Sequence, residues 1–120
     1  MSDFQLGVAE SRFAEIIWEK EPLSSGELVK LSEEKLGWKK STTYTVLKRL
    51  CEKGLFKNER GEESSLVSKD EFYSLQSEKF VKETFDGSLP AFFASFTKRK
   101  SLTAQEVKEI RRMIDDYKED

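Results

Sequence analysis

The feature that most constrains the fold is a change of pattern at Gly54. Before it, apolar residues recur at the three- and four-residue spacing of a helix with one buried face. After it, short alternating runs enclose a turn at 60–63, which is typical of a hairpin. Glycine favours the left-handed backbone that ends a helix. The pattern predicts a helix over 40–53, a strand over 55–59 and a returning strand over 64–67.

Two more helices are predicted upstream. An apolar stripe at helical spacing indicates the first over 7–20. Ser24 and Glu27 form a capping box, which opens the second over 25–36. Trp38 stands in the short link to the next helix, and we expect it to fill the core between the two. Three helices followed by a hairpin form a winged helix-turn-helix arrangement.

The chain after Val67 is predicted to form three amphipathic helices without a sheet. Because about 50 residues of this kind rarely make a free-standing core, we expect their apolar faces to pair with a second copy in a homodimer. A monomer in which these helices fold back onto the winged helix stays open as the alternative. The residues expected at the dimer interface are Phe80, Phe85, Leu89, Phe92, Phe93, Phe96, Val107, Ile110 and Ile114.

The predicted fold class is therefore mainly α with a small β-hairpin. A winged helix-turn-helix domain is expected over 1–69, followed by a helical dimerisation domain over 70–120. No apolar run reaches the length of a membrane span, and the first residues lack the pattern of a secretory signal. The single cysteine, Cys51, excludes an internal disulfide and is expected to pack. We expect a cytoplasmic protein without membrane insertion.

Catalysis is not expected. The chain has no histidine, so the commonest general base and metal ligand is missing. One cysteine without a histidine partner makes no nucleophile pair, and no glycine-rich phosphate loop occurs. The adjacent acids Glu62 and Glu63 are interpreted as a solvated turn surface. The sequence predicts a protein that is not an enzyme, with no metal and no cofactor.

The charge is unevenly distributed. The chain has a net charge of −2, yet residues 35–60 contain eight basic and two acidic side chains, a local net charge of +6. A basic block on an acidic protein is the footprint of a surface that meets phosphates. A solvated helix face would show the same lysines, and a winged helix that docks an acidic protein partner would use them too. Charge alone leaves these interpretations open.

The helix over 40–53 supplies groups suited to double-stranded DNA. Ser41 and Thr42 lie in its first turn, where free N–H groups and the helix dipole favour a phosphate. Thr43, Tyr44 and Thr45 are candidates for contacts with base edges or thymine methyl groups in the major groove. Arg49 either contacts a phosphate or pairs with an acid of the first helix. The residues predicted to contact DNA are Lys39, Lys40, Ser41, Thr42, Thr43, Tyr44, Thr45, Lys48, Arg49, Lys57 and Arg60.

Specific patterns in these helices resemble the penicillinase repressor family, which includes methicillin-resistance and copper-responsive repressors. They are Ile-Ile-Trp at the end of the first helix, the spacing of Trp38, Thr42, Thr45, Leu47, Arg49 and Leu50, and Lys-Gly-Leu at 53–55. The resemblance covers nearly the whole chain. It implies a winged-helix DNA-binding domain, a helical dimerisation domain and repression at dyad operators of resistance genes.

Two positions depart from the family pattern. The copper-responsive branch has a Cys-x-Cys pair near its C-terminus, which this chain lacks, so a metal sensor of that type is excluded. In the β-lactam branch, a membrane-bound sensor protease triggers cleavage of an Asn-Phe bond. The matching bond here joins Ser95 and Phe96. The resemblance thus implies a sensor protease as partner, with asparagine replaced by serine at the cleavage bond.

Overall fold

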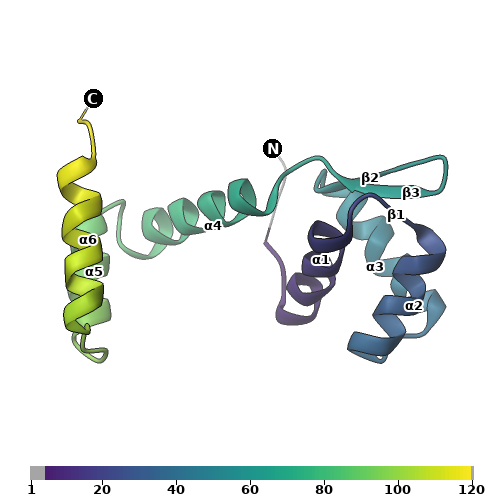
Figure 1. Ribbon diagram of the computed structural model, residues 1–120, viewed down its shortest axis with the longest axis horizontal. Coiled ribbons are helices and arrows are strands. Elements are labelled where there is room, and N and C mark those ends of the chain that lie inside the picture. The colour runs from purple at the N-terminus through teal and green to yellow at the C-terminus, as the bar shows by residue number, and fades with distance from the viewer. Residues whose placement is uncertain (1–4, 120) are drawn as a thin grey trace. The chain divides into compact units, whose positions relative to one another are not determined.

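The computed structural model describes residues 5–119 and divides the chain into two units, one ending at Ser77 and one beginning at Glu78. The elements are α1 (Val8–Lys20), β1 (Leu23–Ser24), α2 (Ser25–Leu36), α3 (Lys40–Glu52), β2 (Phe56–Glu59), β3 (Glu62–Ser65), α4 (Lys69–Thr84), α5 (Leu89–Thr97) and α6 (Ala104–Asp116) (Figure 1). The predicted mainly helical fold with a small hairpin is confirmed. Within residues 5–119, no helix is both long and apolar enough to cross a membrane.

The first unit is a winged helix built on one core. Helices α1, α2 and α3 pack together, and the sheet, in the order β1-β3-β2 with antiparallel pairs, closes the core (Figure 1). Trp38 stacks on Phe13 with ring centroids 5.2 Å apart, as expected for a residue that fills the gap between α2 and α3. The buried apolar residues are Phe13, Ala14, Ile16, Ile17, Leu23, Leu28, Val46, Leu47, Leu50, Leu55, Phe56, Val67 and Phe72.

Helix ends are held by local capping bonds, including the predicted one between Ser24 and Glu27. The Ser24 hydroxyl accepts the Glu27 backbone N–H at 3.1 Å, and α2 ends at Gly37 in the left-handed region with φ of 69°. Thr103 and Glu106 form a reciprocal capping box at the start of α6. Ser68 accepts the Glu71 N–H in the same way at the start of α4. These local bonds satisfy N–H groups that a helix leaves free.

The hairpin differs from the prediction. Its turn contains only Arg60 and Gly61, with φ of 54° and 80°, and β3 begins at Glu62 and not at Ser64. Two residues with positive φ match the twist of a tight hairpin better than a four-residue turn does. The shift places Glu63 in the centre of the sheet, opposite Asn58, where it is fully buried. The interpretation of Glu63 as solvated turn surface was therefore wrong.

The start of α4 belongs to the first unit, eight residues beyond the boundary expected at 69. Trp18 donates its ring N–H to the Val67 carbonyl at 3.0 Å, and its ring lies 5.4 Å from that of Phe72. Glu15 accepts the Tyr73 hydroxyl at 2.8 Å and pairs with Lys69 at 2.7 Å. These contacts join α1 to the first turns of α4.

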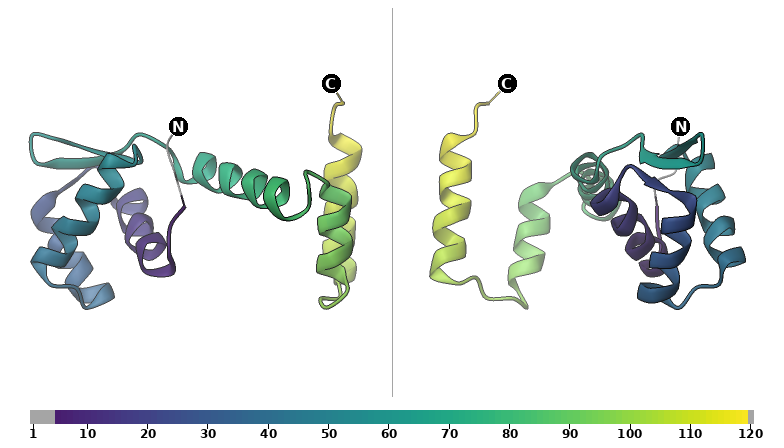
Figure 2. Two further views of the ribbon diagram at one scale, coloured as in Figure 1. Left: turned by 180° about the vertical axis from the view of Figure 1, so that it is seen from behind. Right: turned by 45° about the vertical axis from the view of Figure 1, so that its right-hand side comes forward.

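The second unit consists of the end of α4 together with α5 and α6. Phe80, Phe85 and Phe92 form a ring cluster with centroids 5.5 to 6.0 Å apart, and Phe96 extends it. Figure 2 shows α5 and α6 as two helices joined by the loop 98–103. Large apolar side chains of this unit stay exposed, namely Phe80, Leu89, Phe93, Phe96, Met113, Ile114 and Tyr117.

Candidate nucleic-acid interface

Helix α3 has one buried and one exposed face. Val46, Leu47 and Leu50 pack into the core, and the opposite face carries hydroxyl and basic side chains. Within residues 5–119, no side chain caps the start of α3, and its first turn contains no acid. The first N–H groups of α3 therefore coincide with a basic surface, which favours an anion. The predicted contact residues that the structure leaves exposed on or beside α3 are Lys39, Lys40, Ser41, Thr42, Tyr44, Thr45, Lys48 and Arg49.

Thr43 was predicted to contact DNA, and the structure corrects this prediction. Its side chain is fully buried, and its hydroxyl donates to the Lys39 carbonyl at 3.2 Å. It lies three and seven positions before Val46 and Leu50, so it shares their buried stripe. The methyl group of a threonine can fill such a site because the hydroxyl bonds within the helix. Thr43 is a core residue of α3 and does not belong to the candidate interface.

The sequence left two roles open for Arg49, a phosphate contact or an ion pair with an acid of the first helix. The structure shows the ion pair. Its guanidinium donates to Glu10 of α1 at 3.1 Å, with the arginine side chain 53% and the glutamate 19% exposed. The Gly7 backbone N–H donates to the same carboxylate. Lys53 adds a second tie by donating to the Gln5 carbonyl at 2.9 Å. Arg49 thus fixes α3 against the N-terminal end of α1.

These partners lower the pKa of Glu10. The Gly7 N–H is the largest cause, and Arg49 and Lys53 act in the same sense against the partial burial of the carboxyl group. A carboxyl group whose pKa is lower in the folded state stabilises the fold above its unfolded pKa. This contribution is lost as the pH falls through the lowered value.

We expect Glu10→Gln to flatten the acid limb of the stability profile. In the wild type, the free energy of unfolding should fall as the pH drops below the usual glutamate value of 4.5, and the variant should lose less over that interval. Urea unfolding at a series of pH values between about 7 and about 3 measures the slope. Glu19→Gln, at an exposed position of the same helix, is the control. Equal slopes in Glu10→Gln and the wild type would contradict the assignment.

The wing carries cations and acids on one face. Lys57 is half-buried and pairs with Glu59 at 2.9 Å, whereas Arg60 is exposed at the tip. An open groove along this face is lined by Pro22, Lys57, Glu59, Arg60, Glu62 and Ser64. The pairing of Lys57 leaves Arg60 as the basic group best placed to reach a backbone phosphate from the wing.

A polar cluster beneath the wing was missed by the sequence interpretation. The carboxyl group of Glu63 accepts hydrogen bonds from Ser25 and Asn58. A signal for it was present, because a two-residue turn at Arg60 and Gly61 sets Asn58 opposite Glu63. Strand alternation then sets both on the sheet face of Phe56, where Glu63 is buried and Asn58 is exposed.

Comparisons with known proteins agree with this geometry. The model of the family described as Penicillinase repressor matches residues 6–116. The methicillin resistance regulatory protein MecI of Staphylococcus aureus (strain Mu50 / ATCC 700699) is 23% identical over 92% of this chain and 94% of its own length. MecI of Mammaliicoccus sciuri is 22% identical over the same shares, and a penicillinase repressor of Staphylococcus aureus is 24% identical over 93% of this chain and 92% of its own length. Because the family model spans nearly the whole chain and the winged helix has its basic face on α3, the chain belongs to the penicillinase repressor family.

Proposed function

We propose that this repressor acts as a homodimer on a dyad operator, with α3 of each copy in the major groove. The observation that carries the proposal is the exposed, basic and hydroxyl-rich face of α3 within a winged helix. Recognition helices of helix-turn-helix proteins use such a face, and their dimers bind two half-sites about one helical turn apart. Family membership supports the same function.

The roles of the α3 side chains follow from their positions. Ser41 and Thr42, with the free N–H groups of the first turn, contact a phosphate. Tyr44 and Thr45, further along the exposed face, contact base edges or a thymine methyl group. Lys48 contacts a phosphate. Arg49 orients α3 through Glu10.

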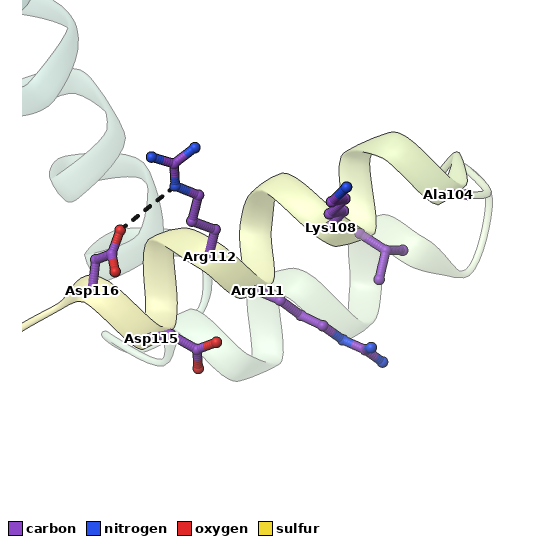
Figure 3. A pocket seen from close by; sticks show the side chains of 7 residues that line it. Ala104, Lys108, Arg111, Arg112, Asp115 and Asp116 are labelled. Atoms are coloured by element: carbon purple, nitrogen blue, oxygen red, sulfur yellow. Dashed lines mark ion pairs between the residues drawn. The ribbon is translucent and has the colours of Figure 1, made fainter.

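Dimerisation is supported by the apolar surface of the second unit. In a single copy of the chain, Met113 and Ile114 of α6 are 70% and 67% exposed, and Tyr117, just after the helix, is 69% exposed. Contiguous exposed apolar residues of this kind mark interaction sites. Another face of α6 is charged: Figure 3 shows Lys108, Arg111 and Asp115 projecting along an open groove, with an ion pair between Arg112 and Asp116. We assign this apolar surface to contact with a second copy.

Control of resistance genes and inactivation by cleavage complete the proposal. The relatives are named for methicillin resistance and for penicillinase, and we assign the same class of regulated gene to this chain. The bond between Ser95 and Phe96 lies in the last turn of α5, which ends at Thr97. A membrane-bound sensor protease, or one that it activates, would need α5 to unwind there, and cleavage would separate α5 from α6.

The test is fluorescence anisotropy with the DNA upstream of the gene that encodes the chain. Specific binding is expected to exceed binding to random duplex by at least about a thousandfold, with affinity falling steeply as salt rises. Weak binding with no sequence preference would overturn the proposal. Salt-resistant binding to a protein partner, with no footprint on DNA, would instead identify a protein-interaction module.

Substitutions on α3 separate the two kinds of contact. Lys48→Ala is expected to weaken binding to all sequences similarly and to lower the salt slope by about one per half-site, because one phosphate contact is lost. Thr45→Ala is expected to cost about 1–3 kcal/mol on the operator and little on random DNA, because it removes a base contact. Competition with operator variants measures the preference. Equal losses on both DNAs for both variants would contradict the assigned roles.

A further inference from the structure

The least expected group in the first unit is the carboxyl group of Glu63. It is fully buried in the middle strand β3, and charged residues are rarely buried without several partners. One oxygen, Oε2, accepts the Ser25 hydroxyl at 2.6 Å and the side-chain amide of Asn58. The other oxygen, Oε1, has no hydrogen-bond partner among residues 5–119. A half-satisfied buried acid is costly, so an explanation is needed for its presence.

Ser25, Asn58 and Glu63 connect three elements, and we name them the wing clamp. Ser25 is the first residue of α2, Asn58 lies on β2 and Glu63 on β3. Besides their bonds to Glu63, the Asn58 amide donates to the Ser25 hydroxyl at 3.2 Å. The wing clamp therefore joins the N-terminal end of α2 to both strands of the hairpin.

The wing clamp also holds the turn at the tip. The Gly61 N–H donates to the Asn58 side-chain oxygen at 3.2 Å, and the Gly61 carbonyl accepts the Ser25 backbone N–H at 3.0 Å. Both polar backbone groups of Gly61 are thus tied, and Gly61 is the neighbour of Arg60. The conformation from which Arg60 projects is therefore fixed by the Asn58 side chain together with the backbone of Ser25.

The charge of Glu63 also affects a side chain of α3. After burial, which is the main cause, the charge of Glu63 contributes to raising the pKa of the Cys51 thiol on α3. The wing clamp includes Asn58 of β2, a strand that contacts α3. It lies within the same unit as both DNA-facing elements, α3 and the wing.

Stability alone does not account for an acid at this position. A buried ionic group can often be replaced by a hydrophobic residue of similar size without loss of stability, whereas directed hydrogen bonds fix a geometry. We propose that Glu63 is a positioning residue that holds the wing tip on α2 and so presents Arg60 to a phosphate of the DNA backbone. This inference rests on the proposed DNA-binding function.

Glu63→Leu tests the inference. Leucine keeps the volume and suits the core face of the sheet, and the donors that lose their acceptor can turn to water, because Asn58 is exposed and Ser25 is partly exposed. The thermal midpoint should therefore change little, while the wing clamp is lost. We expect the operator affinity of the dimer to fall about tenfold. The slope of log K against log salt should decrease in magnitude by about one to two, because each half-site loses the phosphate contact of Arg60. Amide exchange at Gly61 should become at least about tenfold faster.

Two control variants separate position from charge. Glu62→Leu also removes one negative charge from the wing, but Glu62 is exposed and makes no bond in the wing clamp. If only charge mattered, both variants would bind DNA more tightly, whereas positioning predicts weaker binding for Glu63→Leu alone. Glu63→Gln keeps a side-chain oxygen for Ser25 and Asn58 and should bind within about twofold of the wild type.

A double-mutant cycle links the wing clamp to Arg60. Asparagine is favoured at the first position of such a turn, so Arg60→Asn removes the charge while keeping the hairpin. The double variant with Glu63→Leu should bind no worse than Arg60→Asn alone. Additive losses, or wild-type affinity and salt slope in Glu63→Leu, would overturn the inference. Failure of the proposed function has another signature, namely absence of DNA binding by the wild type, which would overturn both.

Discussion

Ile114→Asp is expected to convert the proposed dimer into monomers and to lower operator affinity at least about a hundredfold. Ile114 is exposed in one copy of α6, so the aspartate does little harm to the isolated chain. In a dimer, the same carboxylate would be buried in an apolar contact without a partner. A monomer then loses the high effective concentration of the second recognition helix at the second half-site. Sedimentation at micromolar concentration measures the first effect and anisotropy the second.

Lys118→Gln is the control for Ile114→Asp, because it changes the net charge by the same amount just beyond α6. It should remain dimeric and bind DNA like the wild type. If Ile114→Asp sediments as the wild type does and keeps its operator affinity, then α6 does not form the dimer contact. Wild-type protein that sediments as a monomer would instead favour the arrangement in which the C-terminal helices serve the same chain.

Phe13→Ala is expected to lower the free energy of unfolding by about 3–5 kcal/mol. Phe13 is fully buried on α1 and stacks with Trp38, so its removal leaves a cavity between α1 and the link that precedes α3. Small domains are often only about 5 kcal/mol more stable than their unfolded chains. The variant should therefore keep only about 0–2 kcal/mol of stability, so that up to about half of it is unfolded, and DNA binding should weaken although no DNA contact has changed. Urea unfolding followed by circular dichroism measures the loss.

Val8→Ala provides the matched control for Phe13→Ala. Val8 lies on the same helix but is 82% exposed, so the truncation should change stability by less than about 0.5 kcal/mol. A loss below about 1 kcal/mol for Phe13→Ala would contradict the assignment of Phe13 to the centre of the core. It would also mean that Trp38 rearranges to fill the space.

Local chemistry explains why most helix ends could be predicted from the sequence. Ser24 caps α2, Gly37 ends it, and Thr103 with Glu106 opens α6, each through bonds within a few residues. The apolar stripe of α3 was equally readable, because Val46, Leu47 and Leu50 repeat at helical spacing. Such signals depend little on the rest of the fold.

Two of the differences came from local features that the sequence interpretation did not use, and a third depends on contacts between residues far apart in the chain. Thr43 is polar by composition, yet its place on the stripe of α3 buries it and its hydroxyl bonds within the helix. Glu63 is buried because a two-residue turn sets the strand register, and a difference of one residue in register moves a side chain to the other face of a sheet. The start of α4 belongs to the first unit because Trp18 binds Val67 and packs on Phe72.

Both tryptophans of the chain, Trp18 and Trp38, lie in the first unit. Trp18 of α1 packs against Phe56 of the sheet and Phe72 of α4, and Trp38 stacks on Phe13 in the core. The native tryptophan fluorescence therefore distinguishes the first unit from the second without an added label. Indole emission reports melting of the first unit alone, while far-ultraviolet ellipticity sums over all helices. A difference between the two melting curves would measure directly how far the two units unfold independently.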